Sequence, residues 1–223
     1  STFNGTSSAA PTISGVIALM LEANPDLTWR DVKHILATTA DKIDASRSHT
    51  YQGLSMYEWK ENAAGYEFHP WYGFGKIDAA EALTTASSYT ANSLGSWVTT
   101  GYQTNGIINA AIDHTDYTLN TIAVTKPSGS NGKVEYVRVS VQFDHAIPNS
   151  IGIRLLSPDS TVLNIFQPIT NLGTNPSSIL FDIGVSGLYG ENIEGNWSIA
   201  VDDYKNDSTD GNLIKWGIEV YGN

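Results

Sequence analysis

Almost every position from Ser8 to Ala23 holds a small or aliphatic residue, and this pattern predicts a helix. Because no polar stripe interrupts the run, we expect the helix to be buried on all sides. It should end before Asn24 and Pro25, since proline disfavours helical backbone in the residue before it. The longest apolar stretch, Val16–Ala23, is far shorter than the roughly 20 apolar residues of a membrane span.

A second helix is predicted after Thr28, whose hydroxyl can cap the helix that begins with W-R-D. Asp31 lies in its first turn, where a carboxylate interacts well with free backbone N–H groups. The apolar stripe that follows consists of Val32, Ile35 and Leu36. This spacing is typical of a helix with one buried face.

A third helix is predicted where Asp78 and Glu81 stand three residues apart before A-L-T-T-A. That spacing indicates a capping box, in which each of the two side chains accepts a hydrogen bond from the backbone N–H of the other residue. We expect this helix to close a first domain. The polar segment 87–96 is the expected linker.

Beyond the linker the apolar period changes to two, as in strands with one buried face. The alternation recurs in four segments, Val137–Phe143, Ile151–Leu155, Trp197–Val201 and Ile214–Val220, separated by Gly, Pro, Asn and Asp. This part therefore predicts an antiparallel, jelly-roll-like β-sandwich. The fold class is α + β, with one domain at residues 1–92 and a second at 93–223.

The composition excludes several classes of function. Twelve Lys and Arg stand against 23 Asp and Glu, and the resulting net charge of -11 disfavours nucleic acid as a partner. The same charge favours cationic peptides or divalent cations, although it also serves solubility alone. The chain has no cysteine, which removes disulfides, zinc thiolate sites and thiol catalysis. It opens directly on S-T-F-N-G-T-S-S, without the basic start and apolar region of a targeting signal.

The candidate chemistry lies at the start of the first helix, where Gly5, Thr6 and Ser7 precede the small residues. Free N–H groups at a helix N-terminus stabilise negative charge, and a tetrahedral acyl intermediate carries such charge on its oxygen. Ser7 can therefore act as a nucleophile, with its own backbone N–H directed at the oxyanion. The alternative is a Ser or Thr helix cap, which is the commoner use of these residues there.

A resemblance to a known family favours the first interpretation. Residues 4–36 read N-G-T-S-S-A-A-P-T-I-S-G-V-I-A-L-M-L-E-A-N-P-D-L-T-W-R-D-V-K-H-I-L, which closely resembles the nucleophile segment of subtilisin-like serine proteases. The part L-E-A-N-P-D-L-T-W-R-D-V is similar to the kexin and furin branch. The run H-P-W-Y-G-F-G-K-I-D-A-A at His69–Ala80 resembles the usual end of its protease domain. The first domain is then the C-terminal helical remnant of a subtilisin-like α/β domain.

The second domain resembles the P domain, a β-sandwich that follows the protease domain in kexin-type enzymes. The similar segments are L-L-S-P-D-S-T, G-E-N-I-E-G-N-W-S-I-A-V-D-D and D-G-N-L-I-K-W-G-I-E-V-Y-G. Two departures are visible. Thr12 stands where many subtilases have His, and Ser160 replaces the usual turn glycine after Ser-Pro-Asp.

The resemblance implies a serine endopeptidase that forms an acyl-enzyme on Ser7, with Asn4 and Thr6 lining the substrate groove. Subtilases supply their catalytic residues in the order Asp, His, Ser, so the Asp, the His and the oxyanion Asn are expected before residue 1. The histidines of this chain all follow Ser7, and none stands in the family's His-Gly-Thr context: His34, His49, His69, His114 and His145. We interpret them as surface or packing residues. Alone, the chain is expected to be inactive, and its first helix to be exposed.

The partners implied by the resemblance are the upstream part of the peptidase domain, a protein or peptide substrate, and a pro-segment or chaperone. Cleavage after basic residues and a secreted, periplasmic or extracellular location are implied in the same way. The resemblance also implies structural calcium, held mostly by residues outside this segment.

One acidic loop could hold calcium within the chain. Asp202, Asp203, Asp207 and Asp210 lie together between two predicted strands, and carboxylate oxygens are the ligands that calcium prefers. The spacing lacks the ordered pattern of an EF-hand. A metal site at Asp203, Asp207 and Asp210 therefore competes with a solvated acidic hairpin.

Aromatic residues in the second domain leave a non-catalytic β-sandwich module for protein or carbohydrate binding as the alternative function. The residues concerned are Trp97, Trp197, Trp216, Tyr102, Tyr136 and Tyr221. Trp197 and Trp216 fall on the apolar parity of their strands, which favours packing in the core. Only an exposed row of aromatic rings would support the binding module.

Overall fold

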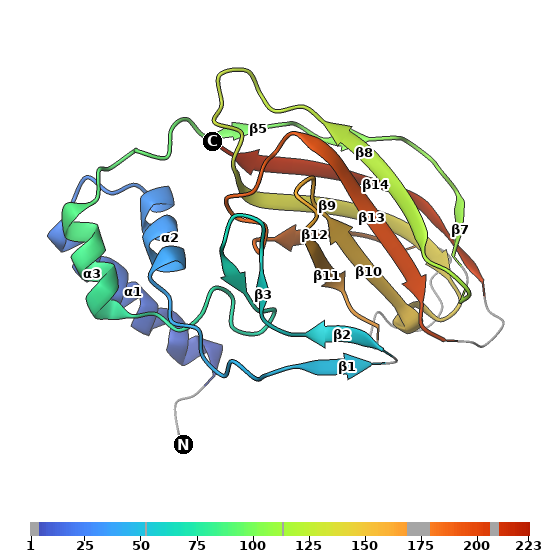
Figure 1. Ribbon diagram of the computed structural model, residues 1–223, viewed down its shortest axis with the longest axis horizontal. Coiled ribbons are helices and arrows are strands. Elements are labelled where there is room, and N and C mark those ends of the chain that lie inside the picture. The colour runs from blue at the N-terminus through green and yellow to red at the C-terminus, as the bar shows by residue number, and fades with distance from the viewer. Residues whose placement is uncertain (1–4, 52, 113, 169–178, 206–209) are drawn as a thin grey trace.

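The computed structural model describes residues 5–51, 53–112, 114–168, 179–205 and 210–223. Helices gather at one side of the molecule and a β-sandwich fills the other, as Figure 1 shows. The helices are α1 (Thr6–Ala23), α2 (Trp29–Thr38) and α3 (Ala79–Ser88). Two short hairpins lie between α2 and α3 in the chain. They are β1 (His49–Tyr51) with β2 (Leu54–Tyr57), and β3 (Lys60–Glu61) with β4 (Glu67–Phe68).

The sandwich consists of two antiparallel sheets. The first has the order β11-β10-β13-β8, and the second has the order β12-β9-β14-β5, with β6 and β7 also paired to β14. The bounds of the remaining elements are β5 Val98–Thr99, β6 Gln103–Thr104, β7 Ala110–Ile112, β8 Thr118–Val124, β9 Val134–His145, η1 Pro148–Ser150, β10 Ile151–Leu156, β11 Val162–Phe166, β12 Ile179–Val185, β13 Gly195–Asp203 and β14 Gly211–Gly222. The predicted fold class, a helical remnant followed by an antiparallel sandwich, is confirmed.

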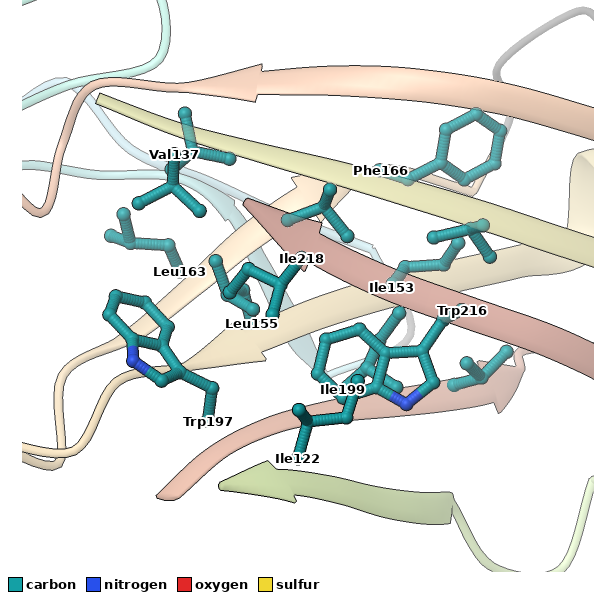
Figure 2. Close-up of a cluster of buried hydrophobic side chains, with 14 of the residues drawn as sticks. Ile122, Val137, Ile153, Leu155, Leu163, Phe166, Trp197, Ile199, Trp216 and Ile218 are labelled. Atoms are coloured by element: carbon teal, nitrogen blue, oxygen red, sulfur yellow. The ribbon is translucent and has the colours of Figure 1, made fainter. Parts of the chain in front are cut away.

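The core of the sandwich lies between the inner faces of the two sheets. Figure 2 shows side chains of both sheets gathered there, including Trp197 and Trp216. Each indole N–H is hydrogen-bonded, Trp197 to the Ile193 carbonyl at 2.8 Å and Trp216 to Asn120 Oδ1 at 2.7 Å. These bonds remove the cost of burying a donor. The prediction that both tryptophans belong to the core is confirmed.

The prediction of which β14 side chains face the core is wrong at Ile214. Leu213 is fully buried and Ile214 is only half-buried, whereas Trp216, Ile218 and Val220 point inward as expected. The pairing with β9 shifts between Leu213 and Lys215. A bulge of this kind adds one residue and changes which parity faces the core.

The α2 cap is confirmed as a full capping box. Thr28 accepts from the Asp31 N–H, and Asp31 accepts from the Thr28 N–H at 2.8 Å. Asp31 also accepts from the Asn92 N–H at 3.1 Å, so one buried carboxylate holds both the helix start and the linker. Burial raises the pKa of Asp31, but the hydrogen bonds from Thr28 and Asn92 outweigh it and lower the pKa.

The predicted capping box of α3 is only half present. Asp78 is the N-cap and accepts from the Glu81 N–H at 2.9 Å, without a reciprocal bond from Glu81 among the contacts of this helix start. The helix runs to Ser88, so the linker begins two residues later than expected. A single side-chain cap is sufficient to begin a helix.

The helix α1 begins and ends close to its predicted bounds, but most of it is exposed. Only Met20 is fully buried; it packs with Ile35, Ala82 and Ala86 in a small cluster between the three helices. Large apolar side chains remain exposed, at 38% for Ile13, 48% for Leu19 and 39% for Leu21. The helix is therefore not buried on all sides within this chain. The expectation that the first helix is exposed in the chain alone is confirmed.

The turn at Ser160 explains one departure from the family pattern. Ser160 has a φ of 71°, in the left-handed region that side chains with a Cβ rarely adopt. The usual glycine would fit this conformation without strain. Serine is tolerated because the turn is closed by bonds between Ser157 and Thr161.

Truncating a core tryptophan tests this account of the sandwich. We expect Trp197→Ala to lower the free energy of unfolding by about 3 to 5 kcal/mol, because it leaves a cavity and an unpaired Ile193 carbonyl. Urea denaturation measures the change. Leu119→Ala on the exposed face of β8 is the control and should stay within about 0.5 kcal/mol of the wild type. An equal loss in both variants would contradict the assigned core.

Candidate active site

Ser7 is the second residue of α1 and is exposed to solvent. The N-cap is Gly5, and no side chain caps the helix. The first helical bonds run from the Ser8 and Ala9 N–H groups to the Gly5 carbonyl. The N–H groups of Thr6 and Ser7 therefore lie before the intrahelical bonds. The structure does not use Ser7 as the helix cap, so the alternative interpretation of this serine is wrong.

The backbone around Ser7 depends on two special residues. Gly5 has a φ of 82°, which a residue with a Cβ adopts only under strain. Pro11 lies inside the helix four residues after Ser7 and has no N–H to donate to the Ser7 carbonyl. The glycine therefore sets the sharp entry to the helix, and the proline leaves its first turn less tightly bonded.

The electrostatics at this end of α1 favour an anion. No acidic side chain lies in the first turn, so nothing within the helix neutralises its positive end. A developing oxyanion next to Ser7 would face the free N–H groups and the helix dipole. The arrangement suits acyl transfer when a base is within hydrogen-bond reach of the Ser7 hydroxyl.

The other predicted groove residues are placed only in part. Thr6 is the first residue of α1 and is exposed beside Ser7. Asn4 lies outside the described residues. The structure thus brings Thr6 and Ser7 together on one open helix turn.

The histidines have structural environments away from Ser7. His34 Nδ1 lies 3.0 Å from the Tyr189 hydroxyl, and His49 stacks on Tyr57. His69 is fully buried and accepts from the Trp71 N–H at 3.0 Å. These contacts agree with packing roles.

His145 and the acidic loop meet at the far end of the sandwich. His145 accepts from the Ile147 N–H at 3.1 Å, and its Nε2 lies 3.4 Å from Asp203 Oδ2. The other oxygen of Asp203 accepts from the Lys205 N–H at 3.0 Å. Oδ1 of Asp203 thus has a hydrogen-bond partner, whereas the buried Oδ2 has only the 3.4 Å approach of His145.

The remaining acidic residues do not complete a metal site within the described part of the chain. Asp202 pairs with Arg154 at 3.0 Å, Asp210 is exposed, and Asp207 lies outside the described residues. Among the described residues, no three His, Cys, Asp or Glu side chains gather where an ion would bind. The carboxylates placed by the structure do not fit a calcium cage. Calcium stays a prediction.

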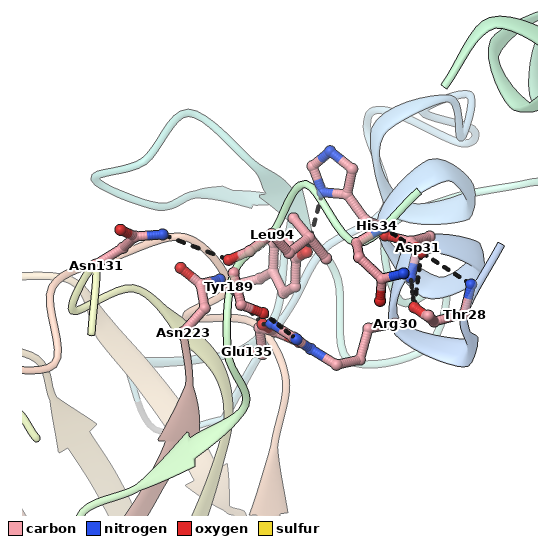
Figure 3. Close-up of polar contacts among 11 residues, drawn as sticks. Thr28, Arg30, Asp31, His34, Leu94, Asn131, Glu135, Tyr189 and Asn223 are labelled. Atoms are coloured by element: carbon pink, nitrogen blue, oxygen red, sulfur yellow. Dashed lines mark hydrogen bonds and ion pairs between the residues drawn. The ribbon is translucent and has the colours of Figure 1, made fainter. Parts of the chain in front are cut away.

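A buried ion pair joins the helical part to the sandwich. Arg30 of α2 reaches Glu135 of β9 through two bonds, Nη2 to Oε1 at 2.5 Å and Nε to Oε2 at 3.1 Å. Asn223 donates to the same carboxylate at 3.0 Å, and Arg30 also donates to the Gly95 carbonyl at 2.6 Å. Figure 3 shows these side chains converging. The forked geometry is the strong form of an ion pair between arginine and a carboxylate.

A second junction lies between the β3–β4 hairpin and the end of the sandwich. The buried Asn62 amide donates to the carbonyls of Gly187 and Tyr189, at 3.1 and 2.9 Å. The Ala63 N–H donates to Glu191 Oε1 at 3.0 Å. The two parts are thus held by buried polar bonds at separate points.

These junctions were not predicted from the sequence, although one signal for them is present at Glu135. Glu135 stands on the same parity as Val137 and Val139, so it is a carboxylate at a buried position of its strand. A buried charge requires a partner of opposite charge. Nothing in the sequence identifies Arg30 as that partner, because the two residues are 105 positions apart.

The fold and this site define a class of protein, a piece of a serine peptidase domain joined to a β-sandwich. The subtilase family profile matches residues 1–75, and the proprotein convertase P-domain profile matches residues 134–220. The chain thus combines the two matched parts that occur together in kexin-type subtilases, a family of serine endopeptidases.

Several known proteins share both parts. A PC3-like endoprotease (variant B) from Hydra vulgaris is 31% identical over 95% of this chain, which spans 29% of that protein. Proprotein convertase subtilisin/kexin type 6 from Rattus norvegicus is 29% identical over 98% of this chain and 23% of its own length. The chain thus spans less than a third of these relatives. An extracellular serine protease from Aeromonas sobria is 29% identical over 98% of this chain and 42% of its own length.

Solved structures support the same arrangement. The crystal structure of the Aeromonas sobria serine protease superimposes with a TM-score of 0.87 at 30% identity, over 100% of this chain and 45% of that one. The same protease in complex with its chaperone gives a TM-score of 0.85. Within the described residues, no helix has the length and apolar character needed to cross a membrane.

Breaking the buried ion pair tests the attachment of α2 to the sandwich. We expect Arg30→Met to lower the free energy of unfolding by about 3 to 5 kcal/mol, because it leaves the Glu135 carboxylate buried without its partner. Urea denaturation measures the effect. Lys42→Met removes an exposed pair with Glu67 and should cost at most about 1 kcal/mol. A loss for Arg30→Met as small as that of the control would exclude a stabilising role for the junction.

His34 gives the junction a pH dependence. Burial lowers the pKa of His34 below its ordinary value of about 6.5, while Asp31 and Glu135 act weakly in the opposite direction. The unfolded chain therefore takes up its proton first as the pH falls. The free energy of unfolding should decrease as the pH drops from about 6.5 through the folded pKa. His34→Gln should remove this part of the decrease in urea titrations at pH 7.5 and pH 5.

The wild-type chain measured at the same two pH values is the control for this titration. An unchanged profile in His34→Gln would show that the His34 proton is not linked to folding.

Proposed function

We propose that this chain is the nucleophile-bearing part of a kexin-type serine endopeptidase and that Ser7 is its nucleophile. The observation that carries the proposal is the position of Ser7. It lies exposed on the open first turn of α1, after a glycine cap, within the segment that the subtilase profile matches. Thr6 and Asn4 are proposed to line the substrate groove.

In the proposed reaction the Ser7 oxygen attacks the carbonyl carbon of the scissile peptide bond. The hydroxyl proton passes to a histidine base supplied by the upstream part of the peptidase domain and then to the leaving amine. The Ser7 N–H and the N-terminus of α1 stabilise the oxyanion, together with the upstream Asn. Water then resolves the acyl-enzyme and restores Ser7.

The exposed side of α1 supports an association with that upstream part. Ile13, Leu19 and Leu21 would be covered by the rest of the peptidase domain, which also supplies the Asp and the His. We propose that the chain by itself does not hydrolyse peptides at an enzymatic rate. Structural calcium, if bound, is proposed to be held mainly by upstream residues.

The sandwich is proposed to support the peptidase part mechanically. The Arg30–Glu135 pair and the Asn62 amide fix α2 and the β3–β4 hairpin against it. The subtilase match over residues 1–75 favours a peptidase over a binding module as the main function.

Partners and location are proposed by analogy with the relatives. The Aeromonas sobria serine protease was solved in complex with a chaperone. The relative of this chain from the same organism is described as an extracellular serine protease. We propose a chaperone or pro-segment as a folding partner, a secreted location, and protein or peptide substrates. Cleavage after basic residues is the proposed specificity.

Labelling with a fluorophosphonate tests the proposal in the protein that includes the upstream part of the peptidase domain. We expect Ser7 to be labelled, and Ser7→Ala to lower kcat by at least about 10³-fold. Ser8→Ala is the matched control, because that hydroxyl bonds to the Gly5 carbonyl at 2.8 Å within the helix start. Label on another serine, or full activity of Ser7→Ala, would exclude Ser7 as the nucleophile.

A further inference from the structure

The outer face of the six-stranded sheet carries aromatic side chains that the peptidase function does not use. Trp97, Tyr102, Tyr136 and Tyr221 lie on it, with exposed fractions of 40% for Trp97 and 48% for Tyr102. In Figure 1 this sheet contains β5, β9, β12 and β14. We call this surface the outer aromatic face. Its exposed rings are Trp97 and Tyr102, whereas Tyr136 and Tyr221 are half-buried.

Two of these rings lie across glycine positions of the sheet. A Cβ on Gly217 would be only 2.2 Å from Cζ and Oη of Tyr102, and a Cβ on Gly184 would be 2.2 Å from Oη of Tyr136. The phenol ends therefore rest directly on backbone, where any larger residue would clash with them. Tyr102, which is 48% exposed, also presents part of its ring to solvent.

The remaining rings continue this surface toward the helices. Trp97 stacks on Tyr221 with ring centroids 5.7 Å apart and an interplanar angle of 21°. Tyr221 lies 5.9 Å from Tyr136, and Trp29 of α2 lies 5.3 Å from Trp97. Trp29, Trp97, Tyr221 and Tyr136 thus form a row of contacting rings. Tyr102 lies apart from this row, over Gly217 of β14, the strand that also carries Tyr221.

Polar side chains lie between the rings. Arg138 pairs with Asp182 at 2.7 Å and with Glu219 at 3.6 Å, and Thr99 donates to Glu219 at 2.9 Å. Beside them is a shallow hollow of about 460 Å³, whose lining includes Tyr102, Arg138, Asp182 and Lys215. The face thus offers hydrogen-bond donors and acceptors next to flat rings.

The charges on this face balance, unlike those of the whole chain. Arg138 and Lys215 oppose Asp182 and Glu219, whereas the chain carries a net charge of -11. A charged partner would gain little from such a surface. These four charged side chains form what we call the polar strip. The hydroxyl groups of a neutral partner would hydrogen-bond to the polar strip, and the apolar faces of its sugar rings would pack on the aromatic rings.

We propose that the outer aromatic face binds a neutral polysaccharide built of pyranose units. The rings hold successive sugars, and the polar strip bonds their hydroxyl groups. Binding here would anchor the peptidase near a glycan-rich surface without involving Ser7. A second copy of this chain on the same face is the competing occupant, and the experiment separates the two.

Native affinity electrophoresis of the full chain tests this proposal. The gels contain xyloglucan, galactomannan or hydroxyethyl cellulose as neutral probes, and polygalacturonate as an anionic probe. We expect at least one neutral probe to retard the chain and polygalacturonate to leave its mobility unchanged. Tyr102→Ala should weaken the retardation at least tenfold, and Tyr102→Phe, which keeps the ring, should retain most of it.

Lys215→Ala provides a second variant that tests the polar strip and should weaken binding by a smaller factor. Trp71→Ala is the matched control, because Trp71 is 51% exposed but lies after β4, away from this face. Thermal unfolding checks that each variant is folded. Failure of every neutral probe to retard the chain, or equal losses in Tyr102→Ala and Trp71→Ala, would overturn the proposal. So would a concentration-dependent dimer in size-exclusion chromatography that Tyr102→Ala abolishes.

Discussion

The Arg30–Glu135 ion pair connects the helix that follows the Ser7 segment to the first long strand of the six-stranded sheet. Both side chains are nearly buried, with exposed fractions of 11% and 3%, so the charges depend on each other rather than on water. The same carboxylate receives the Asn223 amide, and the same guanidinium reaches the Gly95 carbonyl. One ion pair thus connects α2 to the linker at Gly95 and to the last residue of the chain, Asn223.

The position of α1 depends on this arrangement. α1 packs on α3 through a small cluster that includes Met20, Ile35 and Ala82, and α2 completes the cluster from the other side. Because α2 is fixed to the sandwich, the sandwich indirectly positions the helix that carries Ser7. In the proposed peptidase, this attachment gives the sandwich a structural role. The β-sandwich has a core large enough to fold, and the helical remnant has few buried residues of its own.

Local patterns in the chain were sufficient for much of this fold. The period of two in Val137–Phe143 and Trp197–Val201 predicted strands and their inward faces, because successive side chains of a strand alternate between its faces. Thr28 predicted the start of α2 through a bond to a residue three positions away. The same reasoning failed at Ile214, where a bulge changes the parity, and at the second half of the α3 cap. The bulge depends on the pairing of β14 with β9, which the spacing of residues within β14 does not reveal.

The sequence by itself determined the family resemblance, the succession of three helices and an antiparallel sandwich, and the candidate nucleophile, since each rests on residues close together in the chain. Ser7, Gly5 and Pro11 lie within one short run, and the resemblance that singles out Ser7 lies in the same run. The tertiary structure alone decided that Glu135 meets Arg30, and that Trp97 joins Tyr221 and Tyr136 in a row of contacting rings. These contacts join residues that folding brings together from distant positions, and residue type and spacing carry no information about such distances.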